Sequence, residues 1–286
     1  MCRQHFDALP RVKDLFDSAK ELLGYDLAEI CFNGPKEKLD STVVSQPALY
    51  VCGMAAVEVL REKSPDTVRD CQGAAGLSLG EYTALTFAGG LSFEDGLRLV
   101  QKRGEAMQAA SDETPSGMTS VLGLDREKVQ SICDEARIDG ELLLLANFLS
   151  PGNIAVSGHL ESCGRVPEIA KAHGAIGCVP LPVAGAFHTS LMQPAVDKLA
   201  TALSKPQWRD MRIPVYSNVD AKPYSQPSRF RQLLVQQVCS PVLWQQSIEQ
   251  MLADGFDEFY EVGPGRVLRG TMKRISPKIR CQGVLE

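Results

Sequence analysis

One serine stands alone among small residues in the stretch GAAGLSLGEY, residues 73–82. Residues 76–80 fit the pattern Gly-x-Ser-x-Gly, in which two glycines let a strand turn sharply into a helix and leave the Ser78 hydroxyl exposed. The first N–H groups of a helix have no acceptor within it, so the N–H of Leu79 is placed to stabilise an oxyanion. The pattern favours a serine nucleophile. The ordinary alternative is a small-residue turn in which Ser78 only caps the helix.

A serine nucleophile needs a base, and the chain has four histidines. His5 lies close to the start of the chain, His159 follows a Val-Ser-Gly turn, and His173 precedes a glycine at a helix end. His188 follows a glycine-containing loop and opens a helix, from which a side chain can reach across a sheet edge. A lone histidine is more often structural, but a reactive Ser78 requires a partner, and His188 is best placed to be that partner.

Arg103 is the third residue whose position suits chemistry. It falls at the edge of the apolar stripe of a predicted helix over residues 93–110, so its guanidinium can lean toward the interior. There it would hold a carboxylate through two parallel hydrogen bonds. The alternative is a surface arginine whose aliphatic stem covers the stripe. The stripe consists of Leu97, Val100, Gly104 and Met107.

These residues need a scaffold in which strands alternate with helices. Such alternation predicts an α/β fold around a mainly parallel, hydrolase-like sheet. A strand predicted over residues 68–76 would end at the serine turn. Helices are predicted over residues 10–23, from just after Ser45 with Pro47 in the first turn, over 81–88, and after a cap at Ser92.

Residues 116–182 have a different rhythm. A strand, a helix, two strands around the turn Leu-Ser-Pro-Gly, a second helix and a last strand give the order βαββαβ. This order is the split-βαβ arrangement of a ferredoxin-like unit. We therefore expect a large α/β catalytic domain, residues 1–115 and 183–286, with a small ferredoxin-like subdomain, residues 116–182, inserted in it.

The composition is that of an ordinary globular protein, with 44% hydrophobic and 23% charged residues among 286 and a formal net charge of -5. The negative charge argues against a nucleic-acid partner, and no apolar run approaches the roughly 20 residues of a membrane span. Nine cysteines without a CxxC pair predict reduced thiols and no metal site. The first residues resemble neither a signal nor a transit peptide, which predicts a cytoplasmic protein.

Eight stretches of the chain, in the same order, resemble the malonyl-CoA:acyl carrier protein transacylase family. They are GLSLGEYTAL, LVQKRGEAMQ, PSGM, NFLSPGNIAVSG, GAFHTSLMQPA, VYSNVD, QQVCSPVLW and YEVGPGRVL. The resemblance runs from about residue 10 to about residue 275, and the combination is far more specific than any single motif. It implies that Ser78, His188 and Arg103 match the family's nucleophile, base and carboxylate-binding arginine.

The resemblance implies a ping-pong transfer of the malonyl group from malonyl-CoA, through a malonyl-serine ester, to the phosphopantetheine thiol of acyl carrier protein. The enzyme would be a monomer without a cofactor or metal of its own, and would supply fatty-acid synthesis. The family's base is oriented by a backbone carbonyl, here that of Gln237. Phe187 would leave little room for an α-methyl group, and Asn147 would line the cleft side of the small subdomain.

Acyl carrier proteins are acidic, so a net-negative enzyme needs a local positive patch near its cleft. Four cations follow the Val-Gly-Pro-Gly turn with near-helical spacing. They are Arg266, Arg269, Lys273 and Arg274. The alternative is an ordinary solvated helix face.

Two features depart from the family pattern. Leu77 stands where many bacterial members have histidine, and other members carry an apolar residue there. The family also opens with a strand and a PGQGSQ-like loop that completes the oxyanion hole, whereas this sequence starts after that point. Loss of one of two oxyanion donors costs roughly 10²- to 10³-fold in rate, and loss of the strand leaves an open sheet edge. Because the other motifs are intact, we expect a start further upstream, with which a mitochondrial or plastid import signal could have been lost.

Two other functions compete with the transacylase interpretation. An α/β serine hydrolase or thioesterase would share Ser78 and His188, but it expects an HGGG-type loop and a triad acid between them, and neither is marked in the sequence. A truncated, inactive transacylase would share every motif. Acyl-enzyme formation and its fate without a thiol acceptor discriminate among the three.

Overall fold

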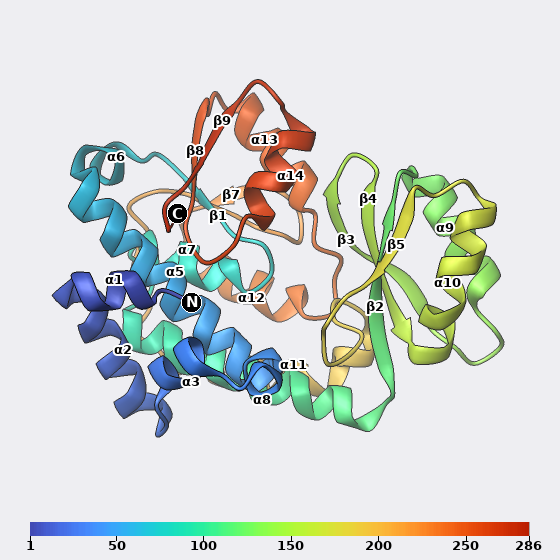
Figure 1. Ribbon diagram of the computed structural model, residues 1–286, viewed down its shortest axis with the longest axis horizontal. Coiled ribbons are helices and arrows are strands. Elements are labelled where there is room, and N and C mark those ends of the chain that lie inside the picture. Colours follow the sequence, from blue (N-terminus) through green and yellow to red (C-terminus); the bar gives the residue numbers. More distant parts are fainter. Residues whose placement is uncertain (286) are drawn as a thin grey trace.

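The computed structural model describes residues 1–285 as an α/β protein with three sheets (Figure 1). Helices make up most of the larger part, and a four-stranded sheet with two helices forms a smaller unit to one side. The predicted α/β class, with a large core and a smaller subdomain, is confirmed.

Six helices make up the first quarter of the chain. They are α1 (Arg3–Ala8), α2 (Pro10–Leu23), α3 (Leu27–Asn33), α4 (Lys36–Asp40), α5 (Thr42–Lys63) and α6 (Pro65–Asp70). Helix α2 ends where the sequence predicts, because Gly24 adopts the left-handed conformation, φ 79°, that favours glycine after a helix. Most of the buried apolar residues of α2, α3 and α5 join one core.

Helix α5 begins earlier than the sequence indicates. The N–H of Ser45 already donates to the carbonyl of Ser41 at 2.7 Å, so Pro47 lies inside the helix and not in its first turn. The β-branched residues before Ser45 lower helix propensity, but the side chains of Thr42 and Val44 are buried here. Tertiary packing therefore overrides the local preference.

Helix α5 also corrects the expectation about apolar length. The helix has 22 residues, and an 18-residue window within it has a mean hydropathy of 1.5, which is enough to cross a membrane by length and composition. However, 72% of that apolar window is buried inside the protein, and α2, α7 and α8 pack against the helix. Its composition is therefore that of a core helix.

The larger part holds short strands in two sheets. Strand β1 (Ala74–Ala75) pairs parallel with β6 (Val215–Tyr216), which pairs antiparallel with β7 (Pro223–Tyr224), and β8 (Glu258–Glu261) pairs parallel with β9 (Arg280–Gly283). The strand predicted over residues 68–76 is thus mostly wrong. Pro65 opens α6, and an Arg69–Asp66 ion pair at helical spacing lies on its surface. Within residues 1–285, β1 has β6 as its single strand neighbour.

The smaller unit is an antiparallel sheet in the order β5-β2-β4-β3, which is the order of a ferredoxin-like sheet (Figure 1). Helices α9 and α10 pack against it. The elements are β2 (Ser116–Leu122), α9 (Arg126–Ala136), β3 (Leu143–Ser150), β4 (Asn153–His159), α10 (Leu160–Ala172) and β5 (Gly177–Pro180). They follow the predicted βαββαβ order, while the exact division at residues 115/116 and 182/183 stays a prediction.

The remaining elements position the candidate site. Helix α7 (Gly80–Phe87) follows β1, and α8 (Phe93–Glu113) is capped by the Ser92 hydroxyl, which accepts from the N–H of Asp95 at 3.0 Å. The later elements are η1 (Ser190–Met192), α11 (Gln193–Leu203), α12 (Pro227–Gln237), α13 (Trp244–Ala253) and α14 (Val267–Ile275). Helix α8 packs against both α5 and α11, so segments that are far apart in the sequence lie side by side.

Candidate active site

Ser78 lies in a sharp turn between β1 and α7 with φ 50°, a left-handed conformation that is uncommon for a residue with a side chain. The turn is so tight that a Cβ on Gly76 would lie 1.9 Å from the carbonyl carbon of Gly80. Asn218 braces the turn, because its Oδ1 accepts from the N–H of Ser78 at 2.6 Å and its Nδ2 donates to the carbonyl of Gly76 at 2.8 Å. This is the geometry of a nucleophile elbow.

The Ser78 hydroxyl lies within hydrogen-bond reach of a base. Its Oγ is 2.9 Å from Nε2 of His188, and Nδ1 of His188 is 2.8 Å from the main-chain oxygen of Gln237. A carbonyl can only accept, so Nδ1 carries the proton and Nε2 is left with a lone pair for the serine. A carbonyl thus takes the place of the acid in a hydrolase triad.

His188 is held as a neutral base. Burial, and next the positive charge of Arg103, lower its pKa from 6.5 to about 4, against the opposing effect of the hydrogen bond to Gln237. The residue also has a left-handed backbone, φ 64°. A neutral imidazole at physiological pH is the state required to accept the serine proton.

Arg103 turns into the protein and not toward solvent, with 2% of its surface exposed. Its Nη2 donates to Ser78 Oγ at 2.9 Å and to Oε1 of Gln237 at 3.0 Å, and its Nη1 donates to Oε1 of Gln46 at 2.7 Å. All three acceptors are uncharged, and burial lowers the pKa of the guanidinium. A carboxylate that enters beside Ser78 would supply the charged partner that these oxygens do not.

A buried carboxyl, that of Glu81, completes the polar cluster. Its Oε1 accepts from the N–H of Asn218 at 2.7 Å, and its Oε2 accepts from Nε2 of Gln237. Burial raises the pKa of Glu81 to about 8, while these two donors and the charge of Arg103 act to lower it. A pKa of about 8 alone would leave this carboxyl mostly protonated at neutral pH, but both groups that contact its oxygens are donors, and on that geometry we assign the ionised carboxylate.

The structure brings together the four residues at the centre of the sequence prediction: Ser78, Arg103, His188 and Gln237. Leu79 precedes α7, so its N–H lies among the first-turn groups without a helical acceptor. Three residues of the cluster were missed, namely Gln46, Glu81 and Asn218. Each of them is a polar residue within an apolar stretch of the sequence. The sequence alone does not distinguish a buried polar residue in such a stretch from one on an exposed face.

Phe187 and Asn147 lie near the small sheet. Phe187 is half-buried, packs against both the main core and a small cluster under the sheet, and its main-chain oxygen accepts from Ser157 Oγ at 2.8 Å. Asn147 is buried on β3, where it pairs with Val242, and its Oδ1 has no hydrogen-bond partner within residues 1–285. Among the described residues, no hydrogen bond links Asn147 to the polar cluster around Ser78.

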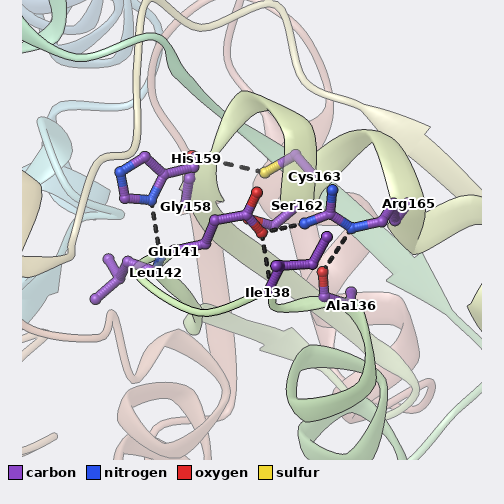
Figure 2. A network of polar contacts seen from close by, with 9 residues as sticks. All are labelled: Ala136, Ile138, Glu141, Leu142, Gly158, His159, Ser162, Cys163 and Arg165. Atoms are coloured by element: carbon purple, nitrogen blue, oxygen red, sulfur yellow. Dashed lines mark hydrogen bonds and ion pairs between the residues drawn. The ribbon is translucent and has the colours of Figure 1, made fainter.

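The small subdomain accounts for two of the other histidines. His159 ends β4, and its Nδ1 accepts from the N–H of Leu142 at 2.7 Å, next to a network in which Glu141 meets Arg165 (Figure 2). His173 follows α10 and lies 2.9 Å from a carboxylate oxygen of Glu135. Both have structural partners, as expected of a histidine at a turn and at a helix end.

Comparison with known proteins supports one family. The sequence model of the family described as "Acyl transferase domain" matches residues 9–276 of this chain. The chain is 42% identical over 275 residues to the mitochondrial malonyl-CoA-acyl carrier protein transacylase of Homo sapiens, covering 92% of this chain and 70% of that protein. It is 41% identical over 280 residues to the malonyl CoA-acyl carrier protein transacylase of Escherichia coli strain K12, covering 97% and 88%.

Solved structures agree with the sequences. The acyl-carrier-protein-S-malonyltransferase of Bartonella henselae matches with a TM-score of 0.93 and 35% identity, covering 100% of this chain and 91% of that one. A malonyl-transacylase in complex with its type II polyketide acyl-carrier protein matches with a TM-score of 0.92 and 36% identity, over 100% and 91% of the two chains. The chain therefore belongs to the acyl transferase domain family, and within it to the malonyl-CoA–acyl carrier protein transacylases.

Proposed function

We propose that this acyltransferase moves the malonyl group of malonyl-CoA to acyl carrier protein through an ester on Ser78. One observation carries the proposal: His188 Nε2 and Arg103 Nη2 each lie 2.9 Å from the same Ser78 oxygen. A base and a carboxylate-binding cation at one nucleophile suit an acyl group that carries its own negative charge.

In the first half-reaction, Ser78 Oγ attacks the thioester carbonyl while its proton passes to His188 Nε2. The N–H of Leu79 donates to the oxyanion of the tetrahedral intermediate. The intermediate collapses with cleavage of the carbon–sulfur bond, and the coenzyme A thiolate takes the proton from His188. A malonyl-serine ester remains.

In the second half-reaction, the phosphopantetheine thiol of acyl carrier protein gives its proton to His188 and attacks the ester. The same oxyanion donor serves this step. Collapse now breaks the carbon–oxygen bond, and the proton returns from His188 to Ser78. The enzyme needs no cofactor of its own in this scheme, because the partner protein carries the phosphopantetheine.

Arg103 selects the acyl group. The malonyl carboxylate would give the guanidinium beside Ser78 the charged partner that the neutral oxygens of Gln46 and Gln237 do not supply, whereas an acetyl group would leave the buried cation without one. The difference is on the order of several kcal/mol for a desolvated charge. We place Phe187 as the residue that crowds an α-methyl substituent, and Asn147 as a polar contact on the small-sheet side of the cleft.

The carrier protein should dock on the exposed positive side chains of α14. Lys273 and Arg274 are exposed there, and Arg266 and Arg269 belong to the same turn and helix. Such a patch suits an acidic partner on a protein whose net charge is -5. Monomeric state and a cytoplasmic or organellar location stay predictions; the relatives from Homo sapiens and Mus musculus are named as mitochondrial.

Intact-protein mass spectrometry after brief mixing with malonyl-CoA tests the proposal on this chain and on Ser78→Ala. We expect a gain of one malonyl group that is absent from the variant. The adduct should persist in water and disappear when holo acyl carrier protein is added, whereas rapid loss without a thiol would favour a hydrolase. Absence of any adduct from the folded chain would overturn the proposed role of Ser78 in this chain.

A further inference from the structure

A fully buried carboxyl lies beside the reacting groups without contacting the substrate in the proposed mechanism. Glu81 is 0% exposed. It lies three residues after Ser78, in the first turn of α7. Its two oxygens accept from the N–H of Asn218 and from Nε2 of Gln237. Burying a carboxylate is costly unless it is well paired, so its presence calls for a role.

The side-chain amide of Gln237 lies between this anion and the buried cation. Its Oε1 accepts from Arg103 Nη2 at 3.0 Å, and its Nε2 donates to Glu81 Oε2 and to the main-chain oxygen of Ser78 at 2.9 Å. The amide dipole therefore has its negative end toward the guanidinium and its positive end toward the carboxylate. Rotation of the amide by 180° would oppose donor to donor and acceptor to acceptor.

We propose that Glu81 is a positioning residue which, through the Gln237 amide, holds the Arg103 guanidinium against the Ser78 hydroxyl and so contributes to the selection of malonyl over uncharged acyl groups. The inference rests on the proposed function, because it assigns Arg103 to the malonyl carboxylate. Glu81 acts at one remove and does not itself touch the acyl group. Together with the main-chain oxygen of Ser78, its carboxylate determines which end of the amide faces the cation.

The isosteric variant Glu81→Gln tests this relay. The new amide can keep an acceptor for the N–H of Asn218, but it then presents its NH2 to the NH2 of Gln237. Gln237 must rotate to restore that hydrogen bond; its own NH2 then leaves the main-chain oxygen of Ser78 and faces Arg103. The guanidinium loses an acceptor and its fixed position, while the Gln237 main-chain oxygen still receives the proton of His188.

The measurement is the rate of acyl-Ser78 formation from malonyl-CoA and from acetyl-CoA, by rapid quench and intact mass. For Glu81→Gln we expect the malonyl-to-acetyl rate ratio to fall on the order of tenfold, the effect of one hydrogen bond to a charged group. The matched control Glu94→Gln, on the exposed face of α8, should leave the ratio unchanged. If both acylation rates fall by the same factor, the ratio is unchanged and the role of Glu81 is merely structural. That result, or unchanged rates with both substrates, overturns the inference.

Two further variants separate the possible failures. Arg103→Ala should abolish the malonyl preference, and if it does not, the proposed role of Arg103 itself fails. If Arg103→Ala loses the preference but Glu81→Gln keeps it, only the inference fails. Gln237→Met removes the amide and keeps the main-chain oxygen, so it should lower the ratio even where Glu81→Gln does not fold. The double variant should be no worse than Gln237→Met alone, since independent additive losses would contradict a relay.

Discussion

Nη2 of Arg103 donates to Oγ of Ser78 at 2.9 Å, so the buried cation and the nucleophile are in direct contact. In a malonyl thioester, one methylene separates the carboxylate from the reacting carbonyl. A cation next to the serine is therefore close enough to hold the carboxylate while the serine attacks the carbonyl. Binding the carboxylate then also orients the carbonyl for the attack.

Replacing Arg103 by lysine should lower kcat/KM for malonyl-CoA at least tenfold. A lysine keeps the charge but cannot serve Ser78, Gln237 and a carboxylate with a planar fork of donors. Acylation by acetyl-CoA should change less than about twofold, because it does not use the fork. The readout is steady-state and single-turnover acylation with both thioesters.

Arg98→Lys is the matched control, because Arg98 is exposed on the same helix and pairs only at the surface with Asp95 at 3.5 Å. It should leave both rates unchanged. Similar losses with malonyl-CoA and acetyl-CoA in Arg103→Lys would show that the arginine supports the fold of the site and not the choice of acyl group.

The acid limb of the pH profile should lie well below the usual range for histidine. Burial and Arg103 lower the pKa of His188 to about 4, so kcat/KM for malonyl-CoA should hold its plateau as the pH falls through 6.5 and decline only toward 4. The profile is measured by single-turnover acylation. A limb centred near 6.5 would contradict a buried neutral base.

The same shift affects stability. Between pH 6.5 and about 4 the unfolded chain binds a proton at this histidine that the folded chain does not, so the free energy of unfolding should fall as the pH falls through that window. His188→Gln should flatten this part of the dependence in denaturant titrations. His173→Gln, at a partly exposed position beside Glu135, serves as the control.

Gly76→Ala should destabilise the fold and remove acylation. The added Cβ would meet the main chain of Gly80 at 1.9 Å, and backbone cannot give way as a flexible side chain can. We expect a loss of more than about 3 kcal/mol in the free energy of unfolding, in the range of the largest single-residue effects. Thermal and urea unfolding measure it.

Gly164→Ala gives the opposite expectation. Gly164 is exposed within α10, and a Cβ there has nothing within 4 Å, so alanine should stabilise the helix by about 0.5–1 kcal/mol. A mild effect of Gly76→Ala, comparable in size to that of Gly164→Ala, would show that the elbow is looser than its geometry indicates.

Charge reversal on α14, by Lys273→Glu with Arg274→Glu, should raise KM for acyl carrier protein and leave KM for malonyl-CoA unchanged. The small substrate does not need the surface field that guides an acidic protein. The effect should weaken at high salt. Lys128→Glu with Lys171→Glu, exposed on α9 and α10, is the matched control for net charge. If KM for both substrates rises together, the patch is not a docking surface for the carrier.

Local features of this protein could be predicted from the sequence because neighbouring residues cause them. The glycines around Ser78, the hydroxyl cap at Ser92, the left-handed Gly24 and the strand order of residues 116–180 all follow from steric and hydrogen-bonding rules that act within a few residues or one supersecondary unit. Where local rules compete with packing they fail, as for the start of α5 and the strand expected over residues 68–76.

The tertiary structure alone decided which polar residues meet. Arg103 and Gln237 are 134 positions apart, and Gln237 and Glu81 are 156 apart, yet one amide joins them. By its helical pattern, Arg103 could have been a surface cation, and nothing near Glu81 marks a buried carboxylate. The outcome depends on which distant groups satisfy each charge once water is excluded, and that pairing is a property of the packed fold and not of any segment.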